Sequence, residues 1–548
     1  MRWTMLILGM AWGVAASAAD PVLDFAYPAG AQPGSEFEVE IGGTELESVR
    51  YAVINGEGVT LTYLGPVKTM IKNPKGKLIP TDVPGRLRFK AVVSKDAEPG
   101  MRALRVSTAY WLSEPVGFEI LASMPELSEP VTNRLPATVY DVTEIPVSLN
   151  GRIHGKAGDL YRFQAAKGTT LVALTEADAL PPGEFLPALM FTNTDGKPCE
   201  GVTVYEQAHA PIAVFEAPED GTYALEVKSA SEAVVGDACA YRIKLGEFPL
   251  VTALSPSGAQ EGENLNVKLE GVNLPRKRVR LFTGGKNSAL CLQTLTENAY
   301  ALPSLRFDLA AEAAAPDFKV TMTPASLNIP AEGSALVTLN VQRLNGFDGE
   351  VRVALDFPPL SIACEGGVIP AGQTTGIMTV STDGLRYPRV VFGLALTATA
   401  EIGGQTVKRP VAPLRGYKRA GGDTTQTFAE LSARANAGLR ALRIDLPLKQ
   451  KTVTIPAKQP ARLFLLSPTI SANWDSQYEP VVVYPPTGFT VQGVQRTNKQ
   501  ERASVMLQAD PKVLKPGAAG HVILGCVQKE DAKRELMAVT QSVPFVVK

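Results

Sequence analysis

Short segments that alternate apolar and polar residues follow one another along most of the chain. Residues 37–41 read FEVEI, and the same alternation returns in 265–269 (LNVKL), 336–341 (LVTLNV) and 351–355 (VRVAL). A period of two places every second side chain on the same face, so each segment predicts a half-buried β-strand. Pro- and Gly-containing turns recur roughly every 8–12 residues, which is typical of β-sandwiches in series. We therefore expect an all-β protein built of tandem β-sandwich domains.

One stretch departs from this alternation. Residues 425–442 (TQTFAELSARANAGLRAL) place apolar side chains three or four positions apart, at Phe428, Leu431, Ala435, Leu439 and Leu442. Asp423 and Gln426, three residues apart, resemble a helix capping box. The spacing predicts one short helix near 425–442, which begins the last domain or leads into it.

An internal repeat appears at a fixed offset of 228 residues. Residues 21–46 read PVLDFAYPAGAQPGSEFEVEIGGTEL, and residues 249–274 read PLVTALSPSGAQEGENLNVKLEGVNL. Nine of the 26 aligned positions are identical without a gap, and they fall at turn and strand positions alike. Each copy predicts a strand, a Pro-Gly turn, an alternating strand and a tight Gly turn. A repeat of this kind indicates building-block architecture, which is common in scaffolds and binding arrays.

Length and charge narrow the class of protein. The chain has 548 residues, which suggests about three to five domains. Its 54 Lys and Arg residues are balanced by 55 Asp and Glu residues. A dedicated nucleic-acid binder would carry a basic excess, so this balance argues against that class.

The first residues predict export. Arg2 precedes the apolar run 5–14 (MLILGMAWGV), and Ala16, Ser17 and Ala18 form a small-residue cleavage site. This arrangement is typical of a secretory signal peptide, here residues 1–18. No later run approaches the roughly 18 apolar residues of a membrane-spanning helix, so we expect none in the mature chain. The predicted location is the periplasm, the cell surface or the medium.

Several blocks between the two copies carry a family resemblance. DLYRF (159–163), APEDGTY (217–223) and YRI (241–243) occur in this order within 135–245. The segment resembles the bacterial pre-peptidase C-terminal (PPC) domain, which implies a jelly-roll-like β-sandwich of an exported protein. It departs from that pattern at 156–158, where relatives often carry a further acidic residue before Asp159.

Other segments resemble immunoglobulin-like modules. The repeated element is similar to the opening of the IPT/TIG module, and 318–413 resembles the sandwiches that follow PPC domains. Ile455-Pro456-Ala457 echoes Ile329-Pro330-Ala331, which suggests a diverged further copy. The predicted organisation is a signal peptide (1–18), an IPT/TIG-like sandwich (19–122), a PPC-like jelly-roll sandwich (123–248), a truncated IPT/TIG-like module (249–312), an Ig-like sandwich (316–415), and a helix with a diverged Ig-like sandwich (416–548).

Catalytic motifs are missing from the sequence. Neither G-x-S-x-G nor H-E-x-x-H occurs. The three histidines, His154, His209 and His521, stand in unrelated contexts, so a relay would need distant segments to converge. We therefore predict no catalytic residues, no organic cofactor and no enzymatic activity.

Calcium is the one metal that the PPC resemblance permits. Asp159, Asn193, Asp195 and Asp220 are predicted in loops of one sandwich, and their hard oxygen ligands suit Ca²⁺. Related sandwiches in secreted collagenases use calcium. Residues 193–196 (NTDG) also read as an ordinary hairpin turn, which is the alternative interpretation.

The five cysteines are widely spaced, without a CxxC pair. Cys199 and Cys239 fall in the same PPC-like segment, and a bridge between them would close a loop of about 40 residues, adding roughly 3–4 kcal/mol. A disulfide and two separate thiols both remain open.

Two surface features suggest binding. Arg276, Lys277, Arg278 and Arg280 form the densest basic cluster (PRKRVRLF), which predicts contact with an anionic polymer or lipid headgroups; the alternative is a solvated hairpin tip. Trp111, and Trp474 with Tyr478, are candidates for stacking on sugars or for core packing.

These features together predict an exported, non-enzymatic, modular binding or scaffold protein of the cell envelope or surface. Its partner would be an envelope or extracellular protein or polysaccharide. The first alternative is an accessory array that targets a secreted peptidase or other hydrolase to a polymer. The second is an enzyme with an unrecognised site in 443–548.

Overall fold

The computed structural model describes residues 20–548, apart from short gaps. The gaps are 73–76, 109–110, 131–132, 134, 136, 182, 206–209, 285–287, 297–298, 303, 311–315, 360–361, 383–391, 420–421, 437–438, 440, 447–450, 467–477, 486, 497–501, 530 and 532. The predicted signal peptide, His209 and Trp474 therefore lie outside the described residues.

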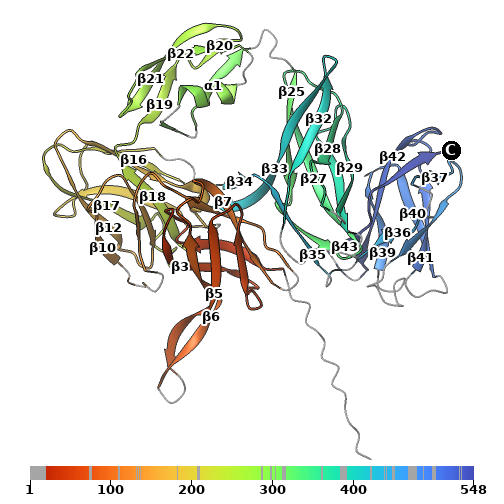
Figure 1. Ribbon diagram of the computed structural model, residues 1–548, viewed down its shortest axis with the longest axis horizontal. Coiled ribbons are helices and arrows are strands. Elements are labelled where there is room, and N and C mark those ends of the chain that lie inside the picture. The colour runs from red at the N-terminus through yellow and green to blue at the C-terminus, as the bar shows by residue number, and fades with distance from the viewer. Residues whose placement is uncertain are drawn as a thin grey trace, which may run out of the picture.

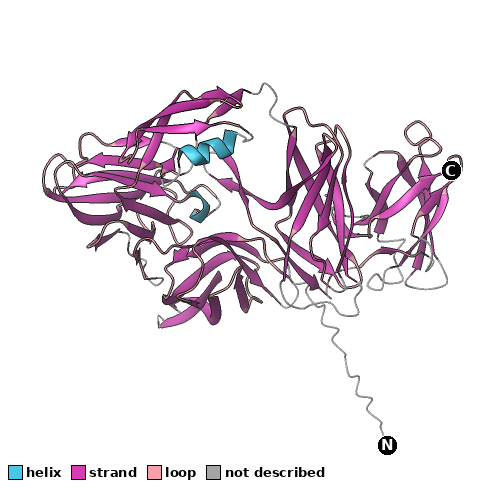
Figure 2. Cartoon of the chain, turned by 45° about the horizontal axis from the view of Figure 1, so that its top comes forward, coloured by secondary structure: helices cyan, strands magenta, loops and turns pink. Residues whose placement is uncertain are grey.

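The prediction of an all-β chain of tandem sandwiches is confirmed. The described residues form a series of β-sheets with one α-helix, α1 (Ser288–Leu295), and one short 3-10 turn, η1 (Ala177–Ala179). Figure 2 shows how completely strands dominate the molecule. We number the five structural units in chain order; each has its own hydrophobic core.

The first unit is a sandwich of two four-stranded sheets. One sheet has the order β1-β3-β6-β5 and the other β2-β8-β7-β4. The strands are β1 (Val22–Tyr27), β2 (Gly30–Ala31), β3 (Glu36–Thr44), β4 (Tyr51–Ile54), β5 (Val59–Lys72), β6 (Leu78–Val93), β7 (Gly100–Ser107) and β8 (Val116–Ile120). Alternate residues of β3 and β6, such as Val39, Ile41 and Phe89, fill the core.

The second unit packs a four-stranded sheet (β10-β12-β17-β14) against a six-stranded sheet (β15-β16-β13-β18-β11-β9). Its strands are β9 (Glu126–Ser128), β10 (Ala137–Asp141), β11 (Val147–Arg152), β12 (Gly158–Ala165), β13 (Thr170–Thr175), β14 (Pro187–Asn193), β15 (Thr203–Tyr205), β16 (Ile212–Glu216), β17 (Gly221–Ser229) and β18 (Ala240–Gly246). Aromatic contacts concentrate in its core, where Phe191 stacks on Phe215 with ring centroids 5.0 Å apart.

The third unit repeats the first in miniature. It contains β19 (Leu250–Ser255), β20 (Gly258–Gln260), β21 (Asn264–Val272), β22 (Arg278–Phe282), β23 (Tyr300–Ala301) and β24 (Asp308–Ala310), with α1 against the sheet. Strands β19 and β21 match β1 and β3 at the same offset of 228 residues. Equivalent bulges interrupt the β1–β3 and β19–β21 ladders. The residues directly after β3 and β21, Glu45 and Asn273, have φ of 56° and 54°. The sequence repeat is thus a structural repeat.

The fourth and fifth units share one continuous sheet, because Ser334 of β27 pairs with Val539 of β43. The fourth has β25 (Asp317–Thr323), β26 (Ser326–Pro330), β27 (Ser334–Leu344), β28 (Val351–Leu355), β29 (Ile362–Ile369), β30 (Thr375–Thr382), β31 (Phe392–Leu394), β32 (Leu396–Ile402), β33 (Gln405–Arg419), β34 (Gly422–Thr427) and β35 (Leu431–Asn436). The fifth has β36 (Arg443–Ile444), β37 (Val453–Ile455), β38 (Ala461–Leu466), β39 (Tyr478–Tyr484), β40 (Phe489–Arg496), β41 (Arg502–Ala509), β42 (Ala519–Gln528), β43 (Leu536–Val539) and β44 (Val543–Val547).

The predicted helix at 425–442 is wrong. The first described residues of this segment are the last residues of β34, and the following ones form β35. Strand β35 pairs with β26 and β31. Leu431, Ala433 and Ala435 satisfy a period of two as well as a helical spacing, and all three are buried. Pairing on both sides of β35 decides between the two periods. Leu431 and Ala433 pack in the fourth core, so this strand completes the fourth unit rather than opening the last domain.

A hairpin arm joins the fourth unit to the first two. Strands β33 and β34 run beyond their own sandwich and lie against the first unit (Figure 1). There Tyr417 Oη donates to the Pro115 carbonyl at 2.9 Å, and Arg415 donates to the Leu23 carbonyl at 3.0 Å. The Gly183 N–H of the second unit donates to the Lys418 carbonyl at 2.8 Å. The arm therefore contacts both neighbouring units.

Candidate interaction surfaces

The predicted basic cluster lies on the exposed face of the third unit's sheet. Arg278 and Arg280 lie in β22 and, with Phe282, project from one face of this strand; all three are exposed. Val279 and Leu281 point the other way, and Leu281 packs in the core with Cys291 of α1. Alternation along one strand thus separates a charged face from an apolar one.

The first unit carries the same strand arrangement with a different charge pattern. Strand β22 pairs with β21 as β6 pairs with β3, so that Arg278, Arg280 and Phe282 correspond to Arg88, Lys90 and Val92. In the first unit, the cations are neutralised across the strands. Arg88 binds Glu38 at 3.3 Å, and Lys90 binds Glu36 at 2.6 Å.

The third unit lacks these acidic partners. Asn264, Asn266 and Lys268 occupy the positions that Glu36, Glu38 and Glu40 occupy in the first unit. Within the described part of the chain, no side-chain hydrogen bond or ion pair is formed by the cluster Arg276, Lys277, Arg278 and Arg280. Lys268 is held by Glu270 at 2.8 Å. The repeat keeps the cations and replaces the acids that neutralise them.

This surface, which we call the basic face, comprises Asn264, Asn266, Arg276, Lys277, Arg278, Arg280 and Phe282. Guanidinium groups bind carboxylate, sulfate or phosphate through paired hydrogen bonds, and amide side chains bind hydroxyl groups. The ring of Phe282 is 56% exposed and offers an apolar stacking surface. The sequence analysis missed Phe282 and the two asparagines. The period of two from Arg278, read together with the 228-residue offset, would have found them.

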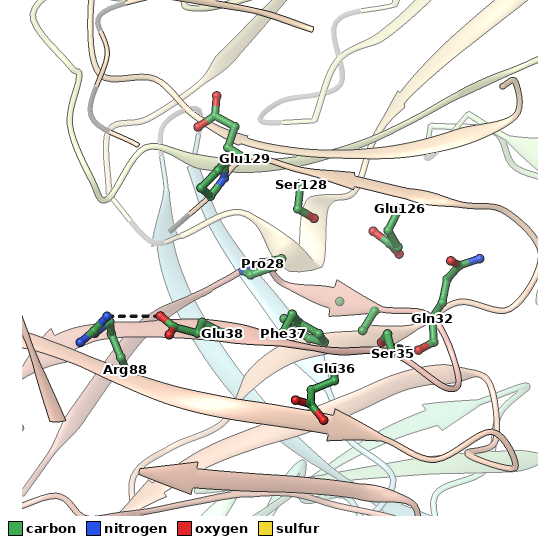
Figure 3. Close-up of a pocket in the computed structure, with 13 residues that line it drawn as sticks. Pro28, Gln32, Ser35, Glu36, Phe37, Glu38, Arg88, Glu126, Ser128 and Glu129 are labelled. Atoms are coloured by element: carbon green, nitrogen blue, oxygen red, sulfur yellow. Dashed lines mark hydrogen bonds and ion pairs between the residues drawn. The ribbon is translucent and has the colours of Figure 1, made fainter. Parts of the chain in front are cut away.

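A cavity of about 650 Å³ lies between the first and second units. Figure 3 shows Glu38 and Arg88 on one side, and Gln32 and Glu126 on the other. Gln32 donates to the Met124 carbonyl at 2.7 Å, and Glu126 accepts from Arg242 at 2.6 Å. The Gln32 hydrogen bond ties the first unit to the segment that leads into the second, and Glu126 pairs within the second unit, so both polar groups are already engaged.

Beside this cavity, buried charges hold the first and second units together. The Arg242 side chain is fully buried and binds Glu119 at 2.9 Å as well as Glu126. Arg152 and Glu40, also fully buried, pair at 2.9 Å across the same interface. Buried ion pairs with several hydrogen bonds fix geometry, because removing either partner leaves a charge without compensation. These buried ion pairs therefore give the interface between the first and second units a structural role.

Two buried carboxyl groups lie at the edge of that interface. Glu129 and Asp159 are each 3% exposed. Burial raises the pKa of Glu129 to about 8, with a further contribution from Asp159, and burial raises the pKa of Asp159 to about 6. Tyr241 donates a hydrogen bond of 2.8 Å to Asp159. Perturbed carboxyls are common at active sites, but these two are enclosed by tyrosines and closed to solvent.

The structure does not gather the four calcium candidates into one site. Asp159 pairs with Val227 on β17, whereas Asn193 pairs with Tyr223, four residues earlier in the same strand. That separation is about 13 Å. The Asn193 side chain accepts the N–H groups of Asp195 and Lys197, and Asp220 accepts that of Lys167, so these oxygens cap turns. The described residues contain no cluster of three or more acidic, His or Cys side chains that suits a metal ion.

The remaining candidates are distributed through the units. Cys199 and Cys239 are free thiols in the structure, without a bridge between them. Trp111 is half-buried beside Leu112, whose backbone bonds Asn328 of the fourth unit. Tyr478 is buried in the core of the fifth unit. His154 faces Asp237 at 3.5 Å.

His521 lines a cavity of about 820 Å³ between the fourth and fifth units, near the region of the enzyme alternative. Burial and the charge of Arg352 lower the pKa of His521. Glu350 is the acidic residue of the lining, and its carboxylate is already bound by Arg352 at 2.5 Å. Among the described residues that line this cavity, no carboxylate is left available to orient His521.

Comparison with known proteins gives structural similarities only. No protein-family model matches the chain, and no curated protein matches it. Solved structures similar to parts of it include domains 5–6 of the S-layer protein SbsC (TM-score 0.17, 12% identity, 42% of this chain and 99% of that chain). Others are the D0-D1 domain of intimin (0.15, 12%, 42% and 97%) and the N-terminal eight Ig domains of Down Syndrome Cell Adhesion Molecule (0.15, 9%, 96% and 73%).

The fold class itself rests on the strands and sheets described above. They define the chain as a multidomain protein of Ig-like β-sandwiches. Among the described residues, no helix has the length and apolar character needed to span a bilayer.

Proposed function

We propose that this protein is an exported, non-enzymatic scaffold that binds an anionic polymer of the envelope or extracellular space through its basic face. The observation that carries the proposal is the altered repeat. The same strand pair holds neutralised cations in the first unit and unneutralised cations in the third. If Arg278 and Arg280 served folding alone, the acidic partners present in the first unit would be expected in the third unit as well. An anionic ligand would supply the negative charges that this strand pair lacks.

The sheet geometry favours an extended polymer over a small ligand. The basic face is an exposed sheet surface, with β22 at the edge of its sheet. Side chains two residues apart along a strand are about 7 Å apart, so Arg278, Arg280 and Phe282 present a row of contacts. A repeating anionic polysaccharide would place several charged groups along such a row, and polar amides beside it suit sugar hydroxyls.

The scaffold role is supported by the way the units are joined. Buried ion pairs connect the first and second units, an arm from the fourth contacts both, and one sheet runs through the fourth and fifth. Such junctions restrain domain motion far more than flexible linkers do. The third unit, which carries the basic face, is joined to the second through Asn273, whose side-chain amide donates to the Thr170 carbonyl at 2.7 Å. Val172 of the second unit and Leu250 of the third also pack in one apolar cluster, so the basic face is held against the second unit.

Binding of the mature chain to polygalacturonate, an anionic polysaccharide, tests the proposal, with neutral dextran as the comparison. We expect salt-sensitive binding to polygalacturonate alone. The double substitution Asn264→Glu/Asn266→Glu restores the acidic pattern of the first unit without removing a cation, and should weaken binding at least about tenfold. Arg88→Gln/Lys90→Gln, the matched change in the first unit, should leave affinity unchanged. Equal effects of both variants, or equal binding to dextran, would contradict the proposal.

A further inference from the structure

The first unit carries a projecting hairpin that its repeat lacks. Strand β6 pairs with β3 only from Arg86 to Val92, so that 78–85 has β5 as its single neighbour. The ribbon formed by 68–72 and 78–82 extends clear of the sandwich (Figure 1). In the third unit β22 is the only described strand at the position of β6, and it begins at Arg278, the equivalent of Arg88, without such an extension. The Ig-like module therefore builds its sheet without this ribbon.

The ribbon exposes apolar side chains on both faces. Met70 is 56% exposed, Leu78 51%, Ile71 45% and Ile79 37%. Residues opposite each other in an antiparallel pair share a face, so Met70 and Pro80 lie on one side, and Ile71 and Ile79 on the other. A two-stranded ribbon is marginally stable in water, and an apolar patch at its end indicates that something else covers it.

Basic residues accompany these apolar side chains. Lys68, Lys72 and Lys77 are exposed in the same part of the ribbon, where Asp82 is the single described acidic residue. A flat protein partner would cover only one face of the ribbon, whereas here both faces carry exposed apolar side chains and the charge is mainly basic. This combination suits the interface of an anionic bilayer, where apolar side chains enter between headgroups and lysines extend to the phosphates.

From this geometry we propose that the β5–β6 ribbon is a membrane-surface anchor that inserts its exposed apolar side chains, Met70, Ile71, Leu78 and Ile79, into the headgroup region of an anionic bilayer. The unpaired backbone groups along both ribbon edges limit the depth, since water must still reach them. The inference stands apart from the polymer-binding proposal. The ribbon and β22 lie on opposite sides of the molecule in Figure 1, so a bilayer on the ribbon leaves the basic face accessible.

The test is co-sedimentation of the mature chain with vesicles of phosphatidylglycerol and phosphatidylcholine in equal parts. The variant Met70→Ser/Ile71→Ser/Leu78→Ser/Ile79→Ser should lose at least about 100-fold in partitioning, because four apolar side chains no longer enter the interface. Lys68→Gln/Lys72→Gln should lose roughly fivefold per lysine, and pure phosphatidylcholine should bind more weakly still. Phe357→Ser is the control, since Phe357 is 90% exposed in the fourth unit.

A second variant guards against misfolding. Removing 68–82 and closing the hairpin with Asn-Gly leaves the pairing of 59–66 with 87–93 and the whole β3–β6 ladder intact, so this variant should fold and fail to sediment. Arg278→Gln/Arg280→Gln should keep ribbon-dependent sedimentation, which separates this result from the polymer assay. Full sedimentation of the deletion variant would overturn the proposal. So would ribbon-dependent dimerisation in light scattering without any vesicle binding, which would assign the ribbon to a second copy of the chain.

Discussion

At the scale of single residues, the charges that organise this molecule are buried ones. Arg152 and Glu40 pair although 112 positions separate them, and Arg242 binds Glu126 of its own unit and Glu119 of the first. Nothing in the local sequence distinguishes these residues from solvated charges. The alternation of apolar and polar residues indicates which face of a strand a residue occupies. It does not indicate whether a second domain covers the polar face. The interface was therefore beyond prediction, although its strands were not.

Arg242→Ala should lower the free energy of unfolding by about 3–5 kcal/mol, because Glu126 would lose its counter-charge at the buried interface and Glu119 would keep only Lys244. Urea denaturation followed by circular dichroism measures this. Arg162→Ala is the control, since Arg162 forms an exposed pair with Asp141 and should cost at most about 1 kcal/mol. Comparable losses in both variants would refute the structural role of the cluster.

Glu129 gives the protein a defined pH dependence. Its pKa is raised to about 8 by burial, above the value of about 4.3 in an unfolded chain, so the folded state retains a proton that the unfolded state releases. Stability should therefore fall as the pH rises from about 4 to about 8. Glu129→Gln should flatten this slope and stabilise the protein at pH 8 by on the order of 2 kcal/mol. Thermal melts across this range measure the effect, with the exposed Glu216→Gln as control; an unchanged slope in Glu129→Gln would be the contrary result.

At the scale of elements, an alternation of apolar and polar residues predicted strands correctly, whereas an apolar spacing of three or four residues predicted a helix that does not form. The pattern VRVAL became β28 with the predicted bounds, and the repeat predicted equivalent strands in the first and third units. Residues 425–442 carried a helical spacing that the partners of β35 overrode. The basic cluster was visible as a run of charges, but its unneutralised state depended on a comparison across strands that only the register provides.

Strand β35 permits a direct check of this correction. Leu431 is fully buried in the fourth core, so Leu431→Ala should cost about 2–5 kcal/mol. Ala429, two residues earlier, is exposed, and Ala429→Ser should change stability by less than about 0.5 kcal/mol. Denaturant unfolding distinguishes the two. A negligible effect of Leu431→Ala would place this segment outside the core.

At the scale of the whole molecule, the account describes a fixed array rather than a string of independent sandwiches. Glu114 of the first unit accepts the backbone N–H groups of Ala325 and Ser326 in the fourth. Asn328 exchanges two hydrogen bonds with the backbone of Leu112, at 2.8 and 2.9 Å. The third unit is joined to the second by Asn273, which donates to the Thr170 carbonyl at 2.7 Å, so the basic face and the β5–β6 ribbon keep a constant separation. That constancy is what a scaffold between two surfaces requires.

Small-angle X-ray scattering of the mature chain in solution tests this central claim most directly. The account predicts that one curve, calculated from the single arrangement of the five units, fits the data at low and high salt alike. Buried ion pairs are screened far less than surface ones, so added salt should not loosen the array. A profile that only an ensemble of independently moving domains reproduces would contradict the account.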